Sequence, residues 1–104
     1  MKKDVLFIIG SDSDRENVRP GIELIEKKNI SYELHVFSAH RNLDDLVEFL
    51  RENERNYRVI IAAAGLSAAL PGVVAAKTSL PVIGIPLVAG HLSGIDALLS
   101  ILQL

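Results

Sequence analysis

The chain of 104 residues carries a net charge of −2, is 49% hydrophobic but only 5% aromatic, and contains no cysteine. A single domain of this size, residues 1–104, has no basic block for nucleic acid, no thiol for a disulfide or a metal, and no apolar run that could span a membrane, and its first residues resemble a cytoplasmic start rather than a signal peptide. So much aliphatic content in so short a chain favours burial between the subunits of a homo-oligomer.

Two strands and two helices are predicted in the first half of the chain. Residues 5–9 are continuously apolar, as in a strand buried on both faces, whereas residues 32–37 alternate like a half-exposed edge strand. Apolar residues at helical spacing predict a helix over residues 14–28, in which Pro20 predicts either a kink or a helix that forms only after it. Asn42 is expected to cap the next helix, whose apolar stripe consists of Leu43, Leu46, Val47 and Leu50.

The second half repeats the alternation with smaller side chains. Residues 58–63 predict a buried strand, 68–78 a helix, and 81–85 a fourth strand stopped by Pro86. A last helix is expected to begin at Ser93 or Asp96 and to run through Leu102. Strands that alternate with helices imply right-handed βαβ units, and therefore a three-layer α/β/α fold with a parallel sheet. With the half-polar second strand at the edge, the strand order is the flavodoxin-like 2-1-3-4.

Polar clusters follow the first two predicted strands, at the carboxyl edge where open α/β sheets bind ligands. The sequence from Gly10 to Asp14 offers hydroxyls, carboxylates and free backbone N–H groups, while the sequence from Ser38 to Arg41 offers a cation and the titratable imidazole of His40. Each cluster alone is more simply a helix cap or a solvated loop. Together at one edge, they suit a phosphorylated substrate and a proton transfer.

Other segments are less specific. Residues 64–72 are nearly all small, which permits close approach of a ligand to the backbone, although tight helix–strand packing is the plainer interpretation. His35 is expected to be structural because it lies within a strand, and His91 is a weaker site candidate. Three scattered histidines without a carboxylate at ligand spacing predict no metal site.

Five segments together resemble the PurE family of purine biosynthesis, over essentially the whole chain. They are residues 10–14, 38–41, 70–78, 80–86 and 92–100. Members of that family are 5-(carboxyamino)imidazole ribonucleotide mutases, which are isomerases, or aminoimidazole ribonucleotide carboxylases, which are lyases. Arginine after His40 resembles the mutase class. The resemblance implies that the carboxylate leaves the exocyclic nitrogen as carbon dioxide and is then attacked by the ring carbon, without a cofactor or a metal.

The resemblance also implies the role of each site residue and the assembly of the enzyme. His40 matches the general acid/base, and the family assembles as a homo-octamer. The residues that match substrate-binding positions are Ser11, Ser13 and Arg41 around the phosphate, Asp14 at the ribose, and Ala64, Gly65 and Leu70 around the base and carbon dioxide. Ser38 is also expected to bind the substrate.

Two departures keep alternatives open. Ala69 stands where the mutase class usually has histidine, and family members continue past the last helix predicted here. One alternative is therefore a catalytically impaired ribonucleotide-binding or assembly relative, whereas an active enzyme would need a substitute for the missing imidazole, for which His91 is the candidate. A carboxylase that uses free carbon dioxide is a further alternative. A flavodoxin-like FMN binder is weaker, because no aromatic residue is placed to flank the flavin ring.

Overall fold

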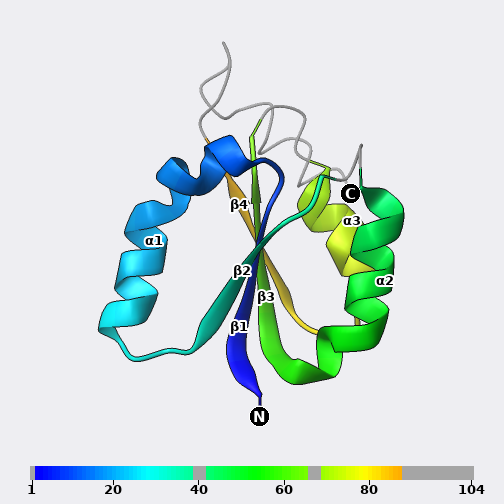
Figure 1. The fold of residues 1–104 in the computed structure, drawn as a ribbon, viewed down its shortest axis with the longest axis horizontal. Coiled ribbons are helices and arrows are strands. Elements are labelled where there is room, and N and C mark those ends of the chain that lie inside the picture. Colours follow the sequence, from blue (N-terminus) through cyan, green and yellow to red (C-terminus); the bar gives the residue numbers. More distant parts are fainter. Residues whose placement is uncertain (1, 39–41, 66–68, 88–104) are drawn as a thin grey trace.

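The computed structural model describes residues 2–38, 42–65 and 69–87, along which strands and helices alternate (Figure 1). The last predicted helix and His91 lie outside these residues, as do His40 and Arg41. The elements are β1 (Lys3–Ile9), η1 (Asp12–Asp14), α1 (Arg15–Lys27), β2 (Tyr32–Val36), α2 (Leu43–Asn53), η2 (Glu54–Asn56), β3 (Tyr57–Ala64), α3 (Leu70–Ala76) and β4 (Val82–Pro86).

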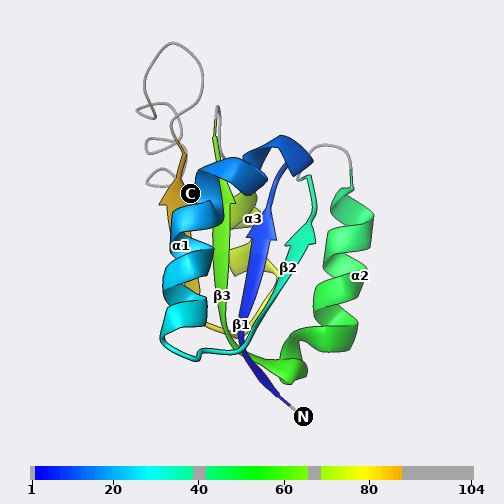
Figure 2. The same ribbon diagram turned by 60° about the vertical axis from the view of Figure 1, so that its left-hand side comes forward.

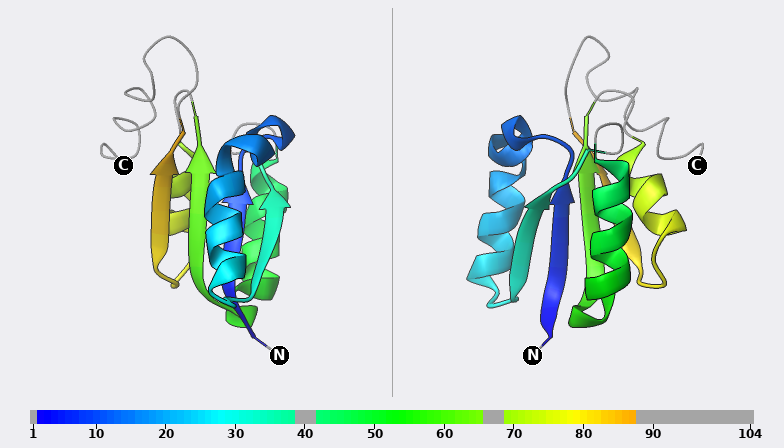
Figure 3. Two further views of the ribbon diagram at one scale, coloured as in Figure 1. Left: turned by 90° about the vertical axis from the view of Figure 1, so that its left-hand side faces the viewer. Right: turned by 45° about the vertical axis from the view of Figure 1, so that its right-hand side comes forward.

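The four described strands form one parallel sheet in the order β2-β1-β3-β4, which confirms the predicted topology. The register places Phe7 of β1 beside Leu34 of β2 and Ile61 of β3. Helix α1 covers one face of the sheet and helices α2 and α3 cover the other, as the two views in Figure 3 show. The three-layer α/β/α architecture is therefore confirmed.

The alternation of side chains along β1 divides the core between these two faces. Val5, Phe7 and Ile9 pack toward α1, whereas Leu6 and Ile8 pack toward α2 and α3. All five are at most 6% exposed, and each large side chain buried in this way stabilises the fold by about 1.5–3 kcal/mol. This two-sided burial explains why the strand reads as an unbroken apolar run.

The outer strands are less buried. Every residue of β2 is partly exposed, which confirms the predicted edge strand. On β4, Ile83 lies beside Ile61 on the α1 side of the sheet and is 52% exposed. Among the described residues, this part of the sheet therefore presents apolar surface to solvent.

Two local expectations need correction. Helix α1 begins at Arg15 and contains Pro20, so the alternative in which the helix forms only after the proline is wrong. Proline has no backbone N–H, so one hydrogen bond within the helix is missing at Pro20. The apolar side chains of Val18, Ile22 and Ile25 pack on the sheet and keep the helix continuous across this position. Asn42 occupies the N-cap position of α2, but its side chain makes no capping hydrogen bond to the helix.

Candidate functional site

The carboxyl ends of the strands lie together at one edge of the sheet (Figure 2). The Phe37 amide donates to the Ile9 carbonyl at 2.9 Å, so β1 and β2 end side by side, and the Leu87 amide donates to the Ala64 carbonyl at 3.0 Å, which aligns the ends of β3 and β4. The Gly10–Asp14 segment and Ser38 therefore leave neighbouring strands at this edge, as predicted. His40 and Arg41 follow Ser38 in sequence but lie outside the described residues.

Two hydroxyls are held close together at the start of the first polar loop. The Oγ atoms of Ser11 and Ser13 are 3.0 Å apart, and Ser11 Oγ accepts a 3.4 Å hydrogen bond from the Ser13 amide. Extended backbone at Ser11 and a 3.0 Å bond from the Asp14 amide to the Ser11 carbonyl shape the turn. Both serines are exposed, so their hydroxyls can rotate to donate to an anion.

The two carboxylates of this loop lie in different environments. Asp12 is 81% exposed and pairs with Arg15 at 2.5 Å. Asp14 is partly buried, and this burial raises the pKa of its carboxyl, while a hydrogen bond from the Ser11 backbone acts in the opposite direction. Among residues 2–38, 42–65 and 69–87, no basic side chain forms an ion pair with Asp14. Its carboxylate is thus the one available to accept from the hydroxyls of a ligand.

The small-residue segment meets the first polar loop at Gly10. A Cβ added to Gly10 would lie 3.8 Å from the Ala64 Cβ and 3.9 Å from the Leu70 Cδ2, which is ordinary contact. Ala64 and Leu70 are 7% and 2% exposed, so their side chains belong to the core. Gly65 and Ala69 are only partly buried. Among the described residues of this predicted wall, Gly65 and Ala69 are therefore the more accessible.

Asn42 makes a contact at this edge that the sequence did not predict. The side-chain oxygen Oδ1 of Asn42 accepts a hydrogen bond from the Ser38 backbone amide at 3.2 Å. The backbone N–H of Asn42 donates to the Ser38 carbonyl at 2.9 Å. The only signal in the sequence was the strong N-cap preference of asparagine, which indicated a different partner for the same oxygen.

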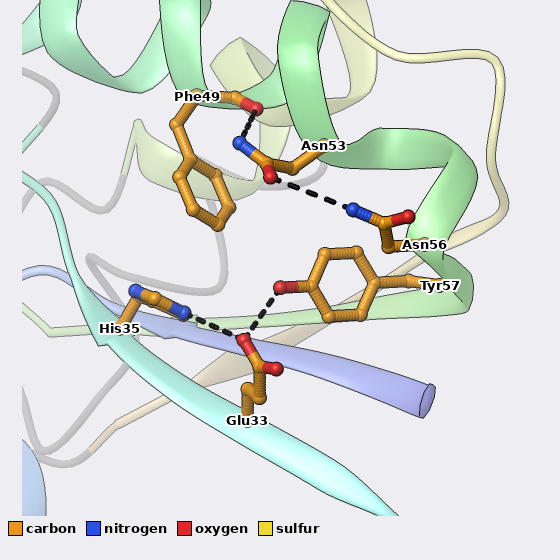
Figure 4. Close-up of polar contacts among 6 residues, drawn as sticks. All are labelled: Glu33, His35, Phe49, Asn53, Asn56 and Tyr57. Atoms are coloured by element: carbon orange, nitrogen blue, oxygen red, sulfur yellow. Dashed lines mark hydrogen bonds and ion pairs between the residues drawn. The ribbon is translucent and has the colours of Figure 1, made fainter. Parts of the chain in front are cut away.

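His35 lies in a polar and aromatic cluster between β2 and α2 (Figure 4). Glu33 Oε1 accepts from the Tyr57 hydroxyl at 2.7 Å and lies 3.1 Å from His35 Nε2. The Tyr57 bond and, second to it, the His35 bond hold the pKa of Glu33 below its usual range. The His35 ring also contacts Phe49, with 4.6 Å between ring centroids, which fits the predicted structural role.

In the described part of the chain, no group of three or more histidine, aspartate or glutamate side chains is arranged to hold a metal ion. Over the same residues, no helix has the length and apolar character needed to cross a membrane.

A parallel sheet with polar loops gathered at its carboxyl edge defines the class of open α/β ligand-binding domains. Residues 4–104 match the model of a protein family described as "AIR carboxylase". Relatives named N5-carboxyaminoimidazole ribonucleotide mutase are 46% identical in Saccharolobus solfataricus (96% of this chain, 64% of the relative), 46% in Bacillus subtilis (100% and 65%) and 45% in Escherichia coli K12 (96% and 60%). The chain therefore belongs to the AIR carboxylase family.

A solved structure agrees with this assignment. The crystal structure of Treponema denticola PurE superposes with a TM-score of 0.87 at 27% identity, covering 99% of this chain and 66% of that one. The chain spans 60–65% of the length of the three curated relatives above. The predicted family membership is confirmed.

Proposed function

We propose that this chain acts as an N5-carboxyaminoimidazole ribonucleotide mutase of purine biosynthesis. The proposal rests on one observation: relatives that are 45–46% identical to this chain carry the name of this mutase. The geometry supports it, because a pair of exposed hydroxyls, the Asp14 carboxylate, which pairs with no described basic side chain, and the small-residue segment meet at one edge of the described sheet.

In the proposed reaction, a carboxylate moves from the exocyclic nitrogen to the ring carbon. The nitrogen–carbon bond breaks, the nitrogen takes up a proton and carbon dioxide is released within the site. The ring carbon then forms a new bond to this carbon dioxide and loses its own proton. One proton enters and one leaves, so the imidazole of His40 can supply the first and accept the second as a single acid/base group.

The remaining proposed roles follow from charge and position. Ser11, Ser13 and Arg41 hold the ribose phosphate, because hydroxyls and a guanidinium donate to its oxygens. The Asp14 carboxylate accepts from ribose hydroxyls. The segment from Ala64 through Gly65 to Leu70 surrounds the base, and small side chains there favour a dry pocket that keeps carbon dioxide from escaping. Ser38 is a further substrate-binding residue.

A homo-oligomer is proposed as the working assembly. Ile83 on β4 is 52% exposed beside partly buried Ile61 and Ile85, and apolar surface of this kind is commonly covered by another part of the assembly. The solution mass of the chain tests this point, and a stable monomer at micromolar concentration would contradict it. The octamer that the resemblance implies and the expected cytoplasmic location stay predictions.

The test of the activity uses the ultraviolet absorbance of the aminoimidazole nucleotides. The wild-type chain should convert the carboxylated nucleotide, and His40→Asn should lose about 10²-fold or more of the rate. Full activity of His40→Asn would remove His40 from its proposed role. Binding of the nucleotide by the wild-type chain without turnover would support the catalytically impaired relative, for which the motivating observation is Ala69 at the N-terminus of α3.

A further inference from the structure

We propose that Arg15 is a positioning residue of the proposed phosphate site, where it holds the Asp12 carboxylate and cancels its charge beside the two phosphate-binding serines. This inference rests on the proposed mutase function. Asp12 lies between Ser11 and Ser13 in the first polar loop, at the carboxyl edge of the sheet (Figure 2). Arg15 Nε donates to Asp12 Oδ1 at 2.5 Å, and the Arg15 backbone N–H donates to the Asp12 carbonyl. Both the side chain and the backbone of Arg15 therefore hold Asp12.

Without a partner, the carboxylate at position 12 would oppose the binding of a phosphate. Its negative charge would repel the phosphate, and a carboxylate is a strong acceptor that competes for the protons of serine hydroxyls. In the structure, the Ser11 and Ser13 hydroxyls bond to each other at 3.0 Å, and Ser11 Oγ also accepts from the Ser13 amide. Asp12 Oδ1 bonds to Arg15 instead. The two hydroxyls are therefore left for an anion.

The charges of this stretch are balanced pair by pair. Residues 10–19 contain three acidic side chains, Asp12, Asp14 and Glu16, and two basic ones, Arg15 and Arg19. Asp12 pairs with Arg15 and Glu16 pairs with Arg19. Asp14, which is proposed to accept from ribose hydroxyls, pairs with no basic side chain among the described residues. Pairing thus leaves a negative charge where the ribose is proposed to bind and cancels the one beside the phosphate.

The exposure of the ion pair favours a role in binding rather than in stability. The Arg15 and Asp12 side chains are 51% and 81% exposed, and exposed ion pairs contribute little to folding. The field of an exposed charge nevertheless reaches about 8 Å at physiological ionic strength, and neighbouring residues are about 3.8 Å apart between Cα atoms. Because the phosphate takes no part in the bond changes, the pair should act on KM and not on kcat.

The experiment compares Arg15→Gln, Asp12→Asn and the double variant in the full chain, by calorimetric titration with carboxyaminoimidazole ribonucleotide. Arg15→Gln leaves the carboxylate without its partner and should raise the dissociation constant about 3- to 10-fold. Asp12→Asn leaves the guanidinium without its partner and should lower the dissociation constant about threefold. The double variant removes both charges and should return to within about twofold of wild type. A double variant as weak as Arg15→Gln, or weaker binding by Asp12→Asn, would overturn the proposal.

Salt and steady-state kinetics separate an electrostatic effect from a disturbed loop. The ratio of the dissociation constants of Arg15→Gln and wild type should fall toward one at about 1 M salt, where the Debye length is about 3 Å. In turnover, Arg15→Gln should raise KM and leave kcat within about twofold of wild type. A loss of affinity that persists at high salt, or a loss that falls on kcat, would show that Arg15 supports the structure of the loop and would overturn the proposal.

Arg19→Gln is the matched control, because it removes the same charge from the next ion pair of α1, one helical turn further from the loop. Arg19 is 59% exposed, close to the 51% of Arg15, so both variants should fold like wild type. The dissociation constant of Arg19→Gln should stay within about twofold of wild type. Equal losses of affinity in Arg15→Gln and Arg19→Gln would assign the effect to the net charge of the chain and would overturn the role of the pair.

Exchange of the Arg15 Nε–H with water, followed by NMR, tests the contact without any ligand. Exchange should accelerate about threefold or more in Asp12→Asn, and unchanged exchange would overturn the contact itself. If the wild-type chain binds the nucleotide and all the variants bind it equally well, the role of Arg15 fails and the proposed function stands. If the wild-type chain neither binds nor converts the nucleotide, the proposed function fails, and the role of Arg15 fails with it whatever the exchange result.

Discussion

Removal of the Tyr57 hydroxyl should destabilise the fold by a defined amount. Tyr57 is 4% exposed, and its hydroxyl donates to Glu33 Oε1 at 2.7 Å. A hydrogen bond to a charged acceptor contributes about 1.5–3 kcal/mol. Because the Glu33 side chain is 41% exposed, water partly replaces the phenol, so Tyr57→Phe should lower the free energy of unfolding by about 1–2 kcal/mol. Each kcal/mol corresponds to about 4–8 °C in Tm for a domain of this size.

The effect should depend on pH in a direction fixed by Glu33. The Tyr57 hydrogen bond, followed by the His35 bond, lowers the pKa of Glu33 in the folded state below its usual 4.5. The resulting stabilisation is complete above the unfolded pKa and disappears as the pH falls through the lower folded pKa. Burial, with the Glu33 bond second, raises the pKa of Tyr57, so its contribution is complete below the usual value of 10 and is lost only in alkali.

The assay is urea denaturation of wild type and Tyr57→Phe at about pH 7 and about pH 3. The difference between them should be full at the higher pH and should shrink at the lower one. Tyr32→Phe is the matched control, because the Tyr32 hydroxyl donates to Glu26 Oε2 at 2.9 Å on the exposed edge, and it should cost less than about 0.5 kcal/mol. Equal costs for the two variants, or a Tyr57→Phe cost that does not change with pH, would refute the reasoning.

Three further predictions concern single positions. Gly21→Ala should raise the free energy of unfolding by about 0.5–1 kcal/mol in urea denaturation, because Gly21 lies inside α1 and a Cβ there meets nothing within 4 Å; a loss of stability would show that the helix is not regular at this point. Glu54→Ala should lower the free energy of unfolding by about 1 kcal/mol in the same assay, because Glu54 Oε1 accepts hydrogen bonds near the surface at 2.9–3.0 Å from Thr78 Oγ1, Ser79 N and Ser79 Oγ. An unchanged free energy of unfolding would mean that water replaces all three bonds. Asp14→Asn should stabilise the free chain at neutral pH, because burial raises the pKa of this carboxyl and the stability it contributes is lost as the pH rises through that raised value. The same variant should weaken nucleotide binding about 10-fold by calorimetry, and unchanged affinity would remove Asp14 from the site.

The strand order was predictable because burial leaves a local trace in the sequence. A central parallel strand is covered on both faces, so residues 5–9 read as an apolar run, whereas the exposed edge gives residues 32–36 their alternation. These two patterns were enough to place β2 outside β1. Because the polar clusters directly follow those strands, their meeting at one edge was predictable as well.

Element ends and side-chain partners were less predictable, because they depend on contacts distant in sequence. The third helix was expected to reach Thr78 but ends at Ala76, where Thr78 and Ser79 turn to Glu54, more than twenty residues away in the chain. The different environments of Asp12 and Asp14, two residues apart in the same motif, arise from burial in the folded chain.

The role of Asn42 was only partly predictable from the sequence. Its local preference correctly predicted the N-cap position of α2. The preference could not show which amide its oxygen would accept from, because it does not distinguish the Ser38 amide, four residues earlier in the chain, from the amides of the first helical turn.

The most direct test of the proposed mutase activity follows the carboxylate carbon itself. The chain is incubated with nucleotide labelled with carbon-13 at the carboxylate, in the presence of excess unlabelled bicarbonate, and the product is analysed by mass spectrometry. A mutase that holds carbon dioxide in a closed site should return product that retains the label on the ring carbon. Product formed with unlabelled carbon would show a carboxylase that uses free carbon dioxide, and the absence of product would contradict the proposed activity altogether.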